Sequence, residues 1–323
     1  MPRSILVVWF ILTSAEPTLA ATAVATYQFN GTLAAAEPGV PPLVPTDPLA
    51  LSGFVPDVVL GVNQYVWSFD GNDNPTNQQA GLTLNTTGLV APTNYSVDLV
   101  FLFTQRDGGW RRIIDVEHRQ SDNGFYVNPQ NNLHVYPISG SSSGWTNNKY
   151  HHVVLTNDGT TVNSYLDGVS QFTTTTNLLN INNANNPDLE LAFFLDNVIA
   201  GGQFEFSDGR VALIRLWNGV LDPVLARQIA SPGYLAGDYN HDGTVGLDDY
   251  DVWRSTIGST TVYDADGNGN FGIDAADYVV WRRNLGNHLA AGTSVAVPEP
   301  ALISVAAIGL VVLSLLRSRA GTR

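Results

Sequence analysis

Cysteine is absent from this chain of 323 residues, and basic residues are scarce, with 15 lysines and arginines against 29 aspartates and glutamates. The lack of cysteine excludes disulfides, thiol catalysis and cysteine-ligated zinc. The net charge of −14 repels phosphate backbones, so a nucleic-acid partner is disfavoured. Charged residues make up only 14% of the chain, and polarity supplied by Asn, Thr, Ser and Gly favours β-structure with many turns over helices.

The N-terminal residues 1–23 have the pattern of a secretory signal peptide. Arg3 is followed by an apolar run over 5–12, and the small residues around Ala21 and Ala23 form a signal-peptidase site. The alternative is a buried N-terminal helix or strand. The pattern predicts an exported protein whose mature chain begins at Ala21 or Val24.

The C-terminal residues 297–323 combine three features in a fixed order. Pro298-Glu299-Pro300 is followed by an uncharged, mostly apolar stretch over 301–316 and then by arginines. This order resembles the PEP-CTERM sorting signal of bacteria, which implies transient anchoring in the inner membrane, processing by an exosortase and an extracellular or cell-surface location. The alternative is a permanent membrane anchor.

Residues 237–287 contain two copies of one pattern, 28 residues apart. The identities between the copies are Asp238 with Asp266, Asn240 with Asn268, Asp249 with Asp277, Tyr250 with Tyr278, Trp253 with Trp281, Arg254 with Arg282, and Gly258 with Gly286. The first copy places oxygen ligands at positions 1, 3, 5, 7 and 12 of a calcium loop, with Gly243 at the sharp turn. Its predicted Ca²⁺ ligands are Asp238, Asn240, Asp242, Thr244 and Asp249.

The second copy allows two registers. A loop starting at Asp264 has Gly269 at the turn but Ala275 at position 12, where alanine binds no metal. A loop starting at Asp266 keeps every identity but puts Phe271 at the turn, where a bulky side chain is strained. We choose the second register and expect this loop to bind calcium more weakly or to stay empty. Its predicted ligands are Asp266, Asn268, Asn270, Gly272 and Asp277.

Two calcium loops, each followed by a helix carrying Tyr and Trp, resemble a type I dockerin. The resemblance implies a helix from Asp249 through Trp253 capped by Gly258, one Ca²⁺ per loop, and a cohesin-like partner protein. Loop positions 10 and 11 are commonly Ser-Thr in that family. Here they are Leu247-Asp248 in the first copy and Ala275-Ala276 in the second. The alternative is an acidic repeat that only solubilises the chain.

Residues 24–231 consist of short alternating runs separated by Gly, Asn, Asp and Pro, which predicts strands. About ten strands over such a length argue for a two-sheet sandwich. The clearest predicted strands are 24–29, 96–103, 110–116, 151–155, 161–166 and 211–217, and the one predicted helix there is 223–229.

Two strings in this region carry a second resemblance. Tyr150 to Gly168 reads as a hairpin ending in a Tyr-x-Asp-Gly turn, and Ser207 to Asp222 reads as a strand that enters a short helix. Both resemble the laminin-G-like, concanavalin A-type jelly roll over residues 95–231. The proline cluster at 38–48 departs from that pattern.

Catalysis is not predicted. Laminarinase-type glycosidases of the same fold carry Glu-x-Asp-x-Glu on one strand. The nearest string here has Ile113 at the nucleophile position, and we expect Asp115 and Glu117 to follow it on the same strand. His151 and His152 are adjacent, so they point to opposite faces of a strand and do not easily serve one ion. We interpret all four polar residues as structural or surface groups.

Trp110 and Trp145 are the predicted ligand-binding residues, because each lies beside a loop and aromatic faces stack on sugars. The alternative is that both are core residues. The sequence therefore predicts an all-β jelly roll joined to a dockerin-like module, a linker over 288–296 and a sorting tail. The predicted function is binding of a glycan or extracellular polysaccharide or matrix at the cell surface. The alternatives are a polysaccharide-degrading hydrolase or lyase component and a structural adhesion protein.

Overall fold

The computed structural model describes residues 21–72, 75–104, 109–140, 144–199, 205–230, 235–240, 242–260, 262, 264–268 and 272–288. The first twenty residues of the predicted leader, Asn270, Phe271 and the predicted tail at 297–323 lie outside these ranges. None of the helices within the ranges is long and apolar enough to cross a membrane.

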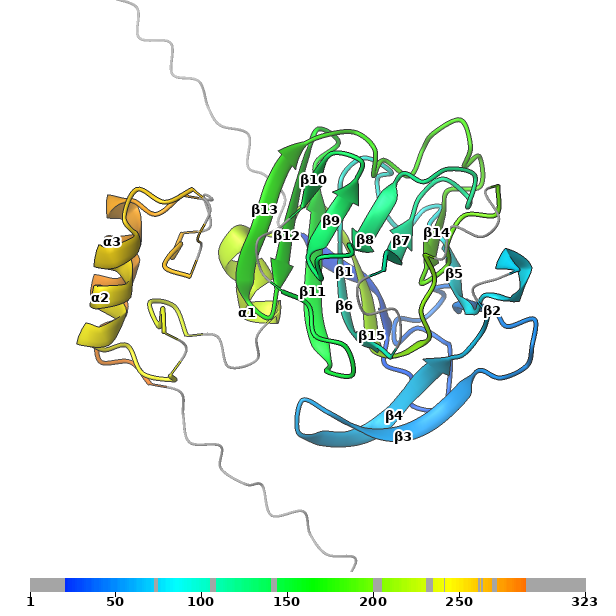
Figure 1. The fold of residues 1–323 in the computed structure, drawn as a ribbon, viewed down its shortest axis with the longest axis horizontal. Coiled ribbons are helices and arrows are strands. Elements are labelled where there is room, and N and C mark those ends of the chain that lie inside the picture. Colours follow the sequence, from blue (N-terminus) through cyan, green and yellow to red (C-terminus); the bar gives the residue numbers. More distant parts are fainter. Residues whose placement is uncertain are drawn as a thin grey trace, which may run out of the picture. The chain divides into compact units, whose positions relative to one another are not determined.

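The described strands form two antiparallel sheets that pack face to face (Figure 1). The eight-stranded sheet has the order β13 (Val169–Thr175), β12 (Thr161–Leu166), β11 (His151–Asn157), β6 (Tyr95–Phe103), β15 (Gly209–Asn218), β4 (Val62–Phe69), β3 (Gly53–Val59), with β1 (Thr22–Tyr27) also paired to β15. The seven-stranded sheet has the order β10 (Ser139–Gly140), β9 (Leu133–Tyr136), β8 (Gly124–Val127), β7 (Arg111–Asp115), β14 (Glu190–Phe193), β5 (Gly81–Asn85), β2 (Val44–Thr46). The predicted jelly-roll sandwich is confirmed.

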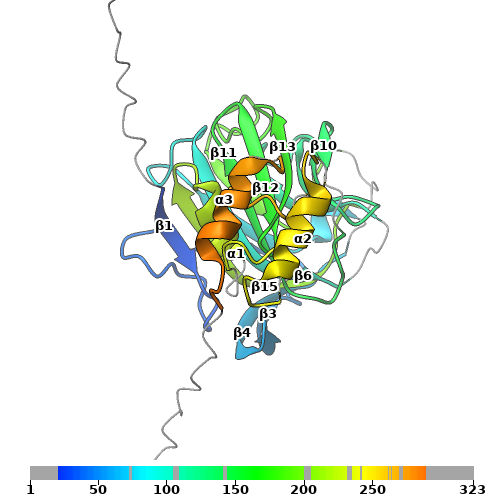
Figure 2. The same ribbon diagram turned by 90° about the vertical axis from the view of Figure 1, so that its left-hand side faces the viewer.

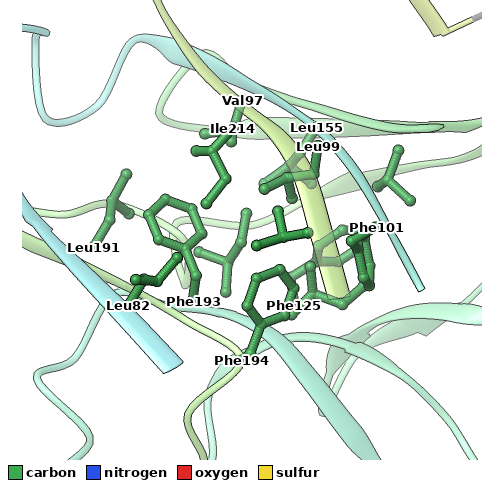
Figure 3. Packing of buried hydrophobic residues seen from close by; sticks show 14 of the residues in the cluster. Leu82, Val97, Leu99, Phe101, Phe125, Leu155, Leu191, Phe193, Phe194 and Ile214 are labelled. Carbon is green, nitrogen blue, oxygen red and sulfur yellow. The ribbon is translucent and has the colours of Figure 1, made fainter. Parts of the chain in front are cut away.

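The main core lies between the two sheets, because alternate residues of each strand point inward. On β6, Val97, Leu99 and Phe101 face the core, and Leu191 and Phe193 on β14 meet them from the other sheet (Figure 3). All of these side chains are fully buried. The alternation of apolar residues in the sequence therefore determines which side chains of each strand point into the space between the sheets.

The other face of β6 is also covered. Val100 and Leu102 pack in a second cluster with Val59 and Val66, which lie on the hairpin formed by β3 and β4. Tyr150 donates its hydroxyl hydrogen to Asp57 Oδ2 at 2.7 Å, which ties the hairpin to the sheet. This double coverage explains why every residue of β6 is buried.

The proline-rich N-terminal part belongs to both sheets, although its sequence departs from the family pattern. Strand β1 pairs with β15, and β2 pairs with β5. The six predicted strands all exist, with ends that differ by up to two residues. The predicted short helix is α1 (Pro223–Ala230), which packs on β11 and β12. Asp222 precedes it and accepts a hydrogen bond from Val224 N at 2.9 Å.

The described residues between 235 and 288 form two loop-and-helix repeats. Helix α2 (Leu247–Thr256) and helix α3 (Ala275–Asn284) pack side by side (Figure 2). Gly258 and Gly286 follow them with φ of 86° and 90°, the left-handed geometry that ends a helix. Buried Tyr239, Val245 and Trp281 belong to a small cluster of this region's own. The predicted helix and its glycine cap are therefore present in both copies.

Candidate functional site

Trp110 lies at the start of β7 within an aromatic cluster, which we define as Trp110, Tyr126, His134 and Tyr136. The Trp110 ring meets the other three rings edge-on, with centroids 5.5 Å, 5.1 Å and 5.3 Å away, respectively. Trp110, His134 and Tyr136 are partly exposed, whereas Tyr126 is buried. The cluster therefore presents aromatic surface to solvent on a rigid sheet.

Strand alternation places this cluster on the outer face of the seven-stranded sheet. On β8, Phe125 and Val127 point into the core, so Tyr126 between them points outward. On β9, Leu133 and Val135 point inward and their neighbours His134 and Tyr136 point outward. Burial lowers the pKa of His134, so the ring is neutral at pH 7.

Charged groups adjoin the aromatic cluster on the same face. The Arg112 guanidinium lies 4.7 Å from the centre of the Tyr126 ring and forms a buried ion pair with Asp115. Its second nitrogen lies 3.5 Å from Asp196 Oδ1, and its backbone N–H donates to the Glu205 carbonyl at 3.1 Å. Arg112, Asp115, Asp196 and Glu205 are called the charged network below.

Two carboxyl groups of the charged network hold their protons more tightly than usual. Burial, together with the charge of Asp196, raises the pKa of Glu205 to about 7. Burial also raises the pKa of Asp196, although the charge of Arg112 acts in the opposite direction. Carboxyl groups whose pKa is displaced beside an exposed aromatic surface are typical of binding and catalytic sites.

Sequence reasoning missed Arg112, Asp196 and Glu205. Residues 192–193 of β14 pair with residues 114–115 of β7, and this pairing brings the end of β14 to Arg112. The one local signal was the arginine pair inside a predicted strand, since a charge at a buried strand position requires a partner.

The prediction that Asp115 and Glu117 lie on one strand is wrong. Strand β7 ends at Asp115, whose Oδ1 accepts backbone hydrogen bonds from Glu117 N at 3.0 Å and Arg119 N at 2.9 Å. Asp115 is fully buried, and Glu117 instead bonds two asparagine side chains. The Asp115 carboxylate at the end of the strand stabilises the turn that follows. The alternation of side chains along a strand does not predict where the strand ends.

Trp145 is a core residue, and the expectation that it is exposed is wrong. Its side chain is 3% exposed, and its ring lies 4.9 Å from Phe101, 5.7 Å from Phe103 and 4.4 Å from His151. Trp145 therefore packs in the core against Phe101 and Phe103 of β6.

The adjacent histidines serve separate partners, as strand alternation predicts. His151 Nδ1 lies 2.7 Å from Asp167 Oδ2, and His152 Nε2 lies 3.0 Å from Asp98 Oδ1. Both rings are buried. They are structural groups of the eight-stranded sheet.

The first predicted calcium loop folds around two buried carboxylates. Asp238 accepts hydrogen bonds from Asp242 N at 3.1 Å and Gly243 N at 2.8 Å, where Gly243 has a φ of 88°. Asp249 accepts from Tyr239 N at 2.7 Å, Asn240 N at 3.0 Å and Gly246 N at 2.7 Å. Thr244 forms a β-bridge with His288.

The second loop repeats these contacts in the register that starts at Asp266. Asp277 accepts hydrogen bonds from Asn268 N at 3.0 Å and Asp274 N at 2.7 Å, each 28 residues after its counterpart. The two copies also exchange bonds: Trp281 Nε1 donates to the Gly246 carbonyl, and Trp253 Nε1 donates to the Asp274 carbonyl. The sequence repeat is therefore a structural repeat.

The donor set of both loops fits a hard cation, although in the described ranges no three His, Asp or Glu side chains gather closely enough to hold a metal ion by themselves. Asp249 and Asp277 are fully buried, and neither has a cationic side chain as a partner within those ranges. Burial raises the pKa of Asp277, with the nearby charge of Asp266 adding to it. Buried carboxylates, an amide oxygen and a carbonyl are the ligands that Ca²⁺ prefers.

A cavity of about 770 Å³ lies where β15 leads into α1. Its polar groups already serve the fold, since Asp222 caps α1 and Asp158 accepts hydrogen bonds from Thr160 and Thr161 in the adjacent turn. Its described lining residues include no aromatic ring. It is therefore less suited to a sugar than the face that carries Trp110.

We compared the chain with protein-family models, curated proteins and solved structures. No curated protein matches the chain. Residues 76–224 match the model of the concanavalin A-like lectin/glucanases superfamily. The match includes the aromatic cluster and the charged network, and it confirms the predicted resemblance to a concanavalin A-type jelly roll.

Solved structures with a similar arrangement share little sequence with the chain. Domain 4 of AbnA, a GH43 extracellular arabinanase from Geobacillus stearothermophilus determined with arabinotriose, is 16% identical, with a TM-score of 0.49, and the alignment covers 66% of this chain and 100% of that domain. The receptor binding domain of botulinum neurotoxin type G is 12% identical, with a TM-score of 0.41 and coverage of 64% and 50%. A Trypanosoma rangeli sialidase is 16% identical, with a TM-score of 0.38 and coverage of 51% and 27%, so the chain spans half or less of these two proteins.

Proposed function

We propose that this chain is an exported bacterial cell-surface protein that binds carbohydrate through the outer face of its seven-stranded sheet. The observation that carries the proposal is the partly exposed Trp110, held edge-on by Tyr126, His134 and Tyr136 beside the charged network. A fixed aromatic face stacks on the C–H surface of a sugar ring, and adjacent charged and amide groups bond its hydroxyls. The match of this region to a lectin/glucanase superfamily supports the same class of ligand.

The proposal also covers the two acidic loops and the two ends of the chain. We propose that the loops at 238–249 and 266–277 each hold Ca²⁺ and that the folded pair docks on a cohesin-like protein, as the dockerin resemblance implies. Calcium would neutralise the buried carboxylates of the two loops, among them Asp249 and Asp277. The leader and the exosortase-processed tail would place the carbohydrate-binding face outside the cell.

The second candidate is a polysaccharide hydrolase, since the matched superfamily includes glucanases. The burial of Asp115 and its ion pair with Arg112 argue against the laminarinase arrangement. Release of reducing sugar from a β-glucan by the wild type, and its loss in Glu117→Ala, would make the protein an enzyme.

An array of immobilised glucans, xylans, mannans and arabinans tests the proposal with the full-length chain. The wild type should bind at least one neutral glycan, and Trp110→Ala should bind it at least tenfold more weakly. Tyr65→Ala is the matched control, because Tyr65 is an exposed aromatic residue, 51% accessible, on β4 of the other sheet. Equal loss in both variants, or no glycan binding by the wild type, contradicts the assignment.

A further inference from the structure

Ala21 belongs to the folded sandwich, although it lies where the predicted leader ends. Strand β1 begins at the next residue, and Thr22 and Ala23 are its first residues paired with β15. Ala21 is partly buried and packs against the apolar cluster formed by α1, β11 and β12. A Cβ atom added to Gly219 would lie 3.4 Å from Ala21 Cα, so the two backbones are in contact. Residues 21–23 therefore contribute to the sandwich.

The structure distinguishes two cuts that the sequence permits, one before Ala21 and one before Val24. Ala20 and Ala23, the residues that precede these cuts, are both small, as a signal peptidase requires. A cut before Val24 removes Ala21 from the cluster at α1 and the first two paired residues from β1. A cut before Ala21 leaves every pair between β1 and β15 in place. The fold therefore favours a mature chain that begins at Ala21.

Ala21 also lines the cavity of about 770 Å³ where β15 leads into α1. The titratable groups among the described lining residues are two carboxylates, Asp158 in the turn between β11 and β12 and Asp222 just before α1. Backbone hydrogen bonds hold both in place, from Thr160 N to Asp158 and from Val224 N to Asp222, each at 2.9 Å. No lysine, arginine or histidine is among the described lining residues. The cavity therefore attracts a cation.

A cut before Ala21 creates a cation at this place. In the precursor the Ala21 nitrogen is part of an uncharged peptide bond. Hydrolysis of that bond by water leaves a carboxylate on Ala20 and an amine on Ala21, and the amine takes up a proton to become an ammonium group at pH 7. A Cβ atom added to Gly219, which lines the cavity as well, would lie 3.9 Å from this nitrogen. The new charge therefore forms at the wall of the acidic cavity.

We propose that the leader is removed between residues 20 and 21 and that the new α-ammonium group of Ala21 enters the cavity as the counter-ion of Asp158 and Asp222. This inference rests on the proposed export of the chain. A chain cut before Val24 would lack this contact, because Val24 is not among the described residues that line the cavity. The occupant of the cavity is thus the N-terminus of the mature chain itself.

The first measurement is the N-terminus of the exported protein, read by mass spectrometry. The wild type should begin at Ala21. Ala20→Leu places a large residue before the proposed cut and should abolish this product. The matched variant Ala23→Leu, at an exposed position of β1, should still begin at Ala21. A wild type that begins at Val24 overturns the inference and leaves export intact, whereas surface protein that keeps Met1 removes both the inference and the proposed export.

The second measurement is the pKa of the Ala21 amine in the exported protein. Competitive acetylation with acetic anhydride from pH 6 to 10, read by mass spectrometry of the N-terminal peptide, gives this value without any variant. An unpaired α-amino group has a pKa of about 7.7–8.0, and the two carboxylates should raise the pKa above that range.

Asp222→Asn should lower the pKa of the Ala21 amine, because asparagine can still accept the hydrogen bond from Val224 N but carries no charge. Asp251→Asn, on the exposed side of α2, is the matched control and should leave the pKa unchanged. A wild-type pKa within the range of an unpaired amine, or an equal effect of the two variants, overturns the assignment of the counter-ion.

Discussion

At the scale of single residues, the two tryptophans chosen from the sequence have opposite roles. Trp110 is partly exposed among outward-facing rings, and Trp145 is buried against Phe101 and Phe103. Both precede or follow Gly- and Ser-rich loops, so the local sequence does not separate them. The difference depends on which of the two rings the tertiary structure packs into the core.

The first prediction separates stability from binding at these two positions. Trp145→Ala should lower the free energy of unfolding by about 3–5 kcal/mol, because it empties a packed aromatic site. Trp110→Ala should cost much less stability and should instead weaken glycan binding. Urea unfolding followed by circular dichroism checks both, and a larger stability loss for Trp110→Ala than for Trp145→Ala would contradict the assignment.

A second residue-scale prediction concerns Asp57 on the β3–β4 hairpin. Burial alone would raise its pKa, but hydrogen bonds from Arg210 and Tyr150 and the charge of Arg210 outweigh burial, so the pKa lies below the ordinary 3.8. A lowered folded-state pKa stabilises the protein above pH 3.8 and ceases to do so as pH falls through the folded value.

Asp57→Asn should therefore lower the free energy of unfolding by about 1 kcal/mol at pH 7, a modest value because the pair is partly exposed. The difference from the wild type should shrink as the pH falls below 3.8. Urea unfolding at a series of pH values checks this. Asp251→Asn, on the exposed side of α2, is the control. A difference that grows in acid would disprove the stabilising role of the hydrogen bonds that Asp57 accepts from Arg210 and Tyr150.

At the scale of elements, the strands and helices follow from local patterns, and their pairing does not. The predicted hairpin over 150–168 is β11 and β12, joined across a turn to β13 at Asp167 and Gly168, whose φ values are 50° and 86°. The 28-residue repeat correctly predicted two equivalent helices, α2 and α3. Because the residues of each acidic loop are local in sequence, their grouping is predictable from spacing alone.

The third prediction tests whether the two acidic loops bind calcium. Asp249→Ala should reduce the calcium-binding heat most, because Asp249 would close the first loop at position 12. Asp277→Ala should have a smaller effect, since the second loop has Phe271 at the turn position. Calorimetry of calcium binding to the full-length chain measures both, with Asp251→Ala as the control. A wild type that takes up no calcium would contradict the dockerin-like interpretation.

At the scale of the whole molecule, a jelly-roll sandwich, two acidic loops and two terminal segments combine in one acidic chain. A net charge of −14 favours solubility and disfavours anionic partners. Cysteine is absent, and the sandwich is held instead by a core that runs through both sheets.

The fourth prediction concerns the two ends of the chain. Protein recovered from the cell surface should begin at Ala21 or Val24, because the signal peptidase removes the leader. Substitution of Pro298-Glu299-Pro300 by alanines should retain the protein in the inner membrane. Mass spectrometry of surface and membrane fractions measures both, and Met1 on surface material would contradict export through this leader.

The sequence by itself determined the fold class, the positions of the main strands and the register of the acidic repeat, because period-two alternation and loop spacing are local properties of the chain. Tertiary structure alone decided the site. Arg112 meets Asp196 and Glu205 only because β14 pairs with β7, and Trp145 is buried only because its ring packs against Phe101 and Phe103 of β6. Contacts between residues far apart in sequence depend on strand order, and no local pattern encodes strand order.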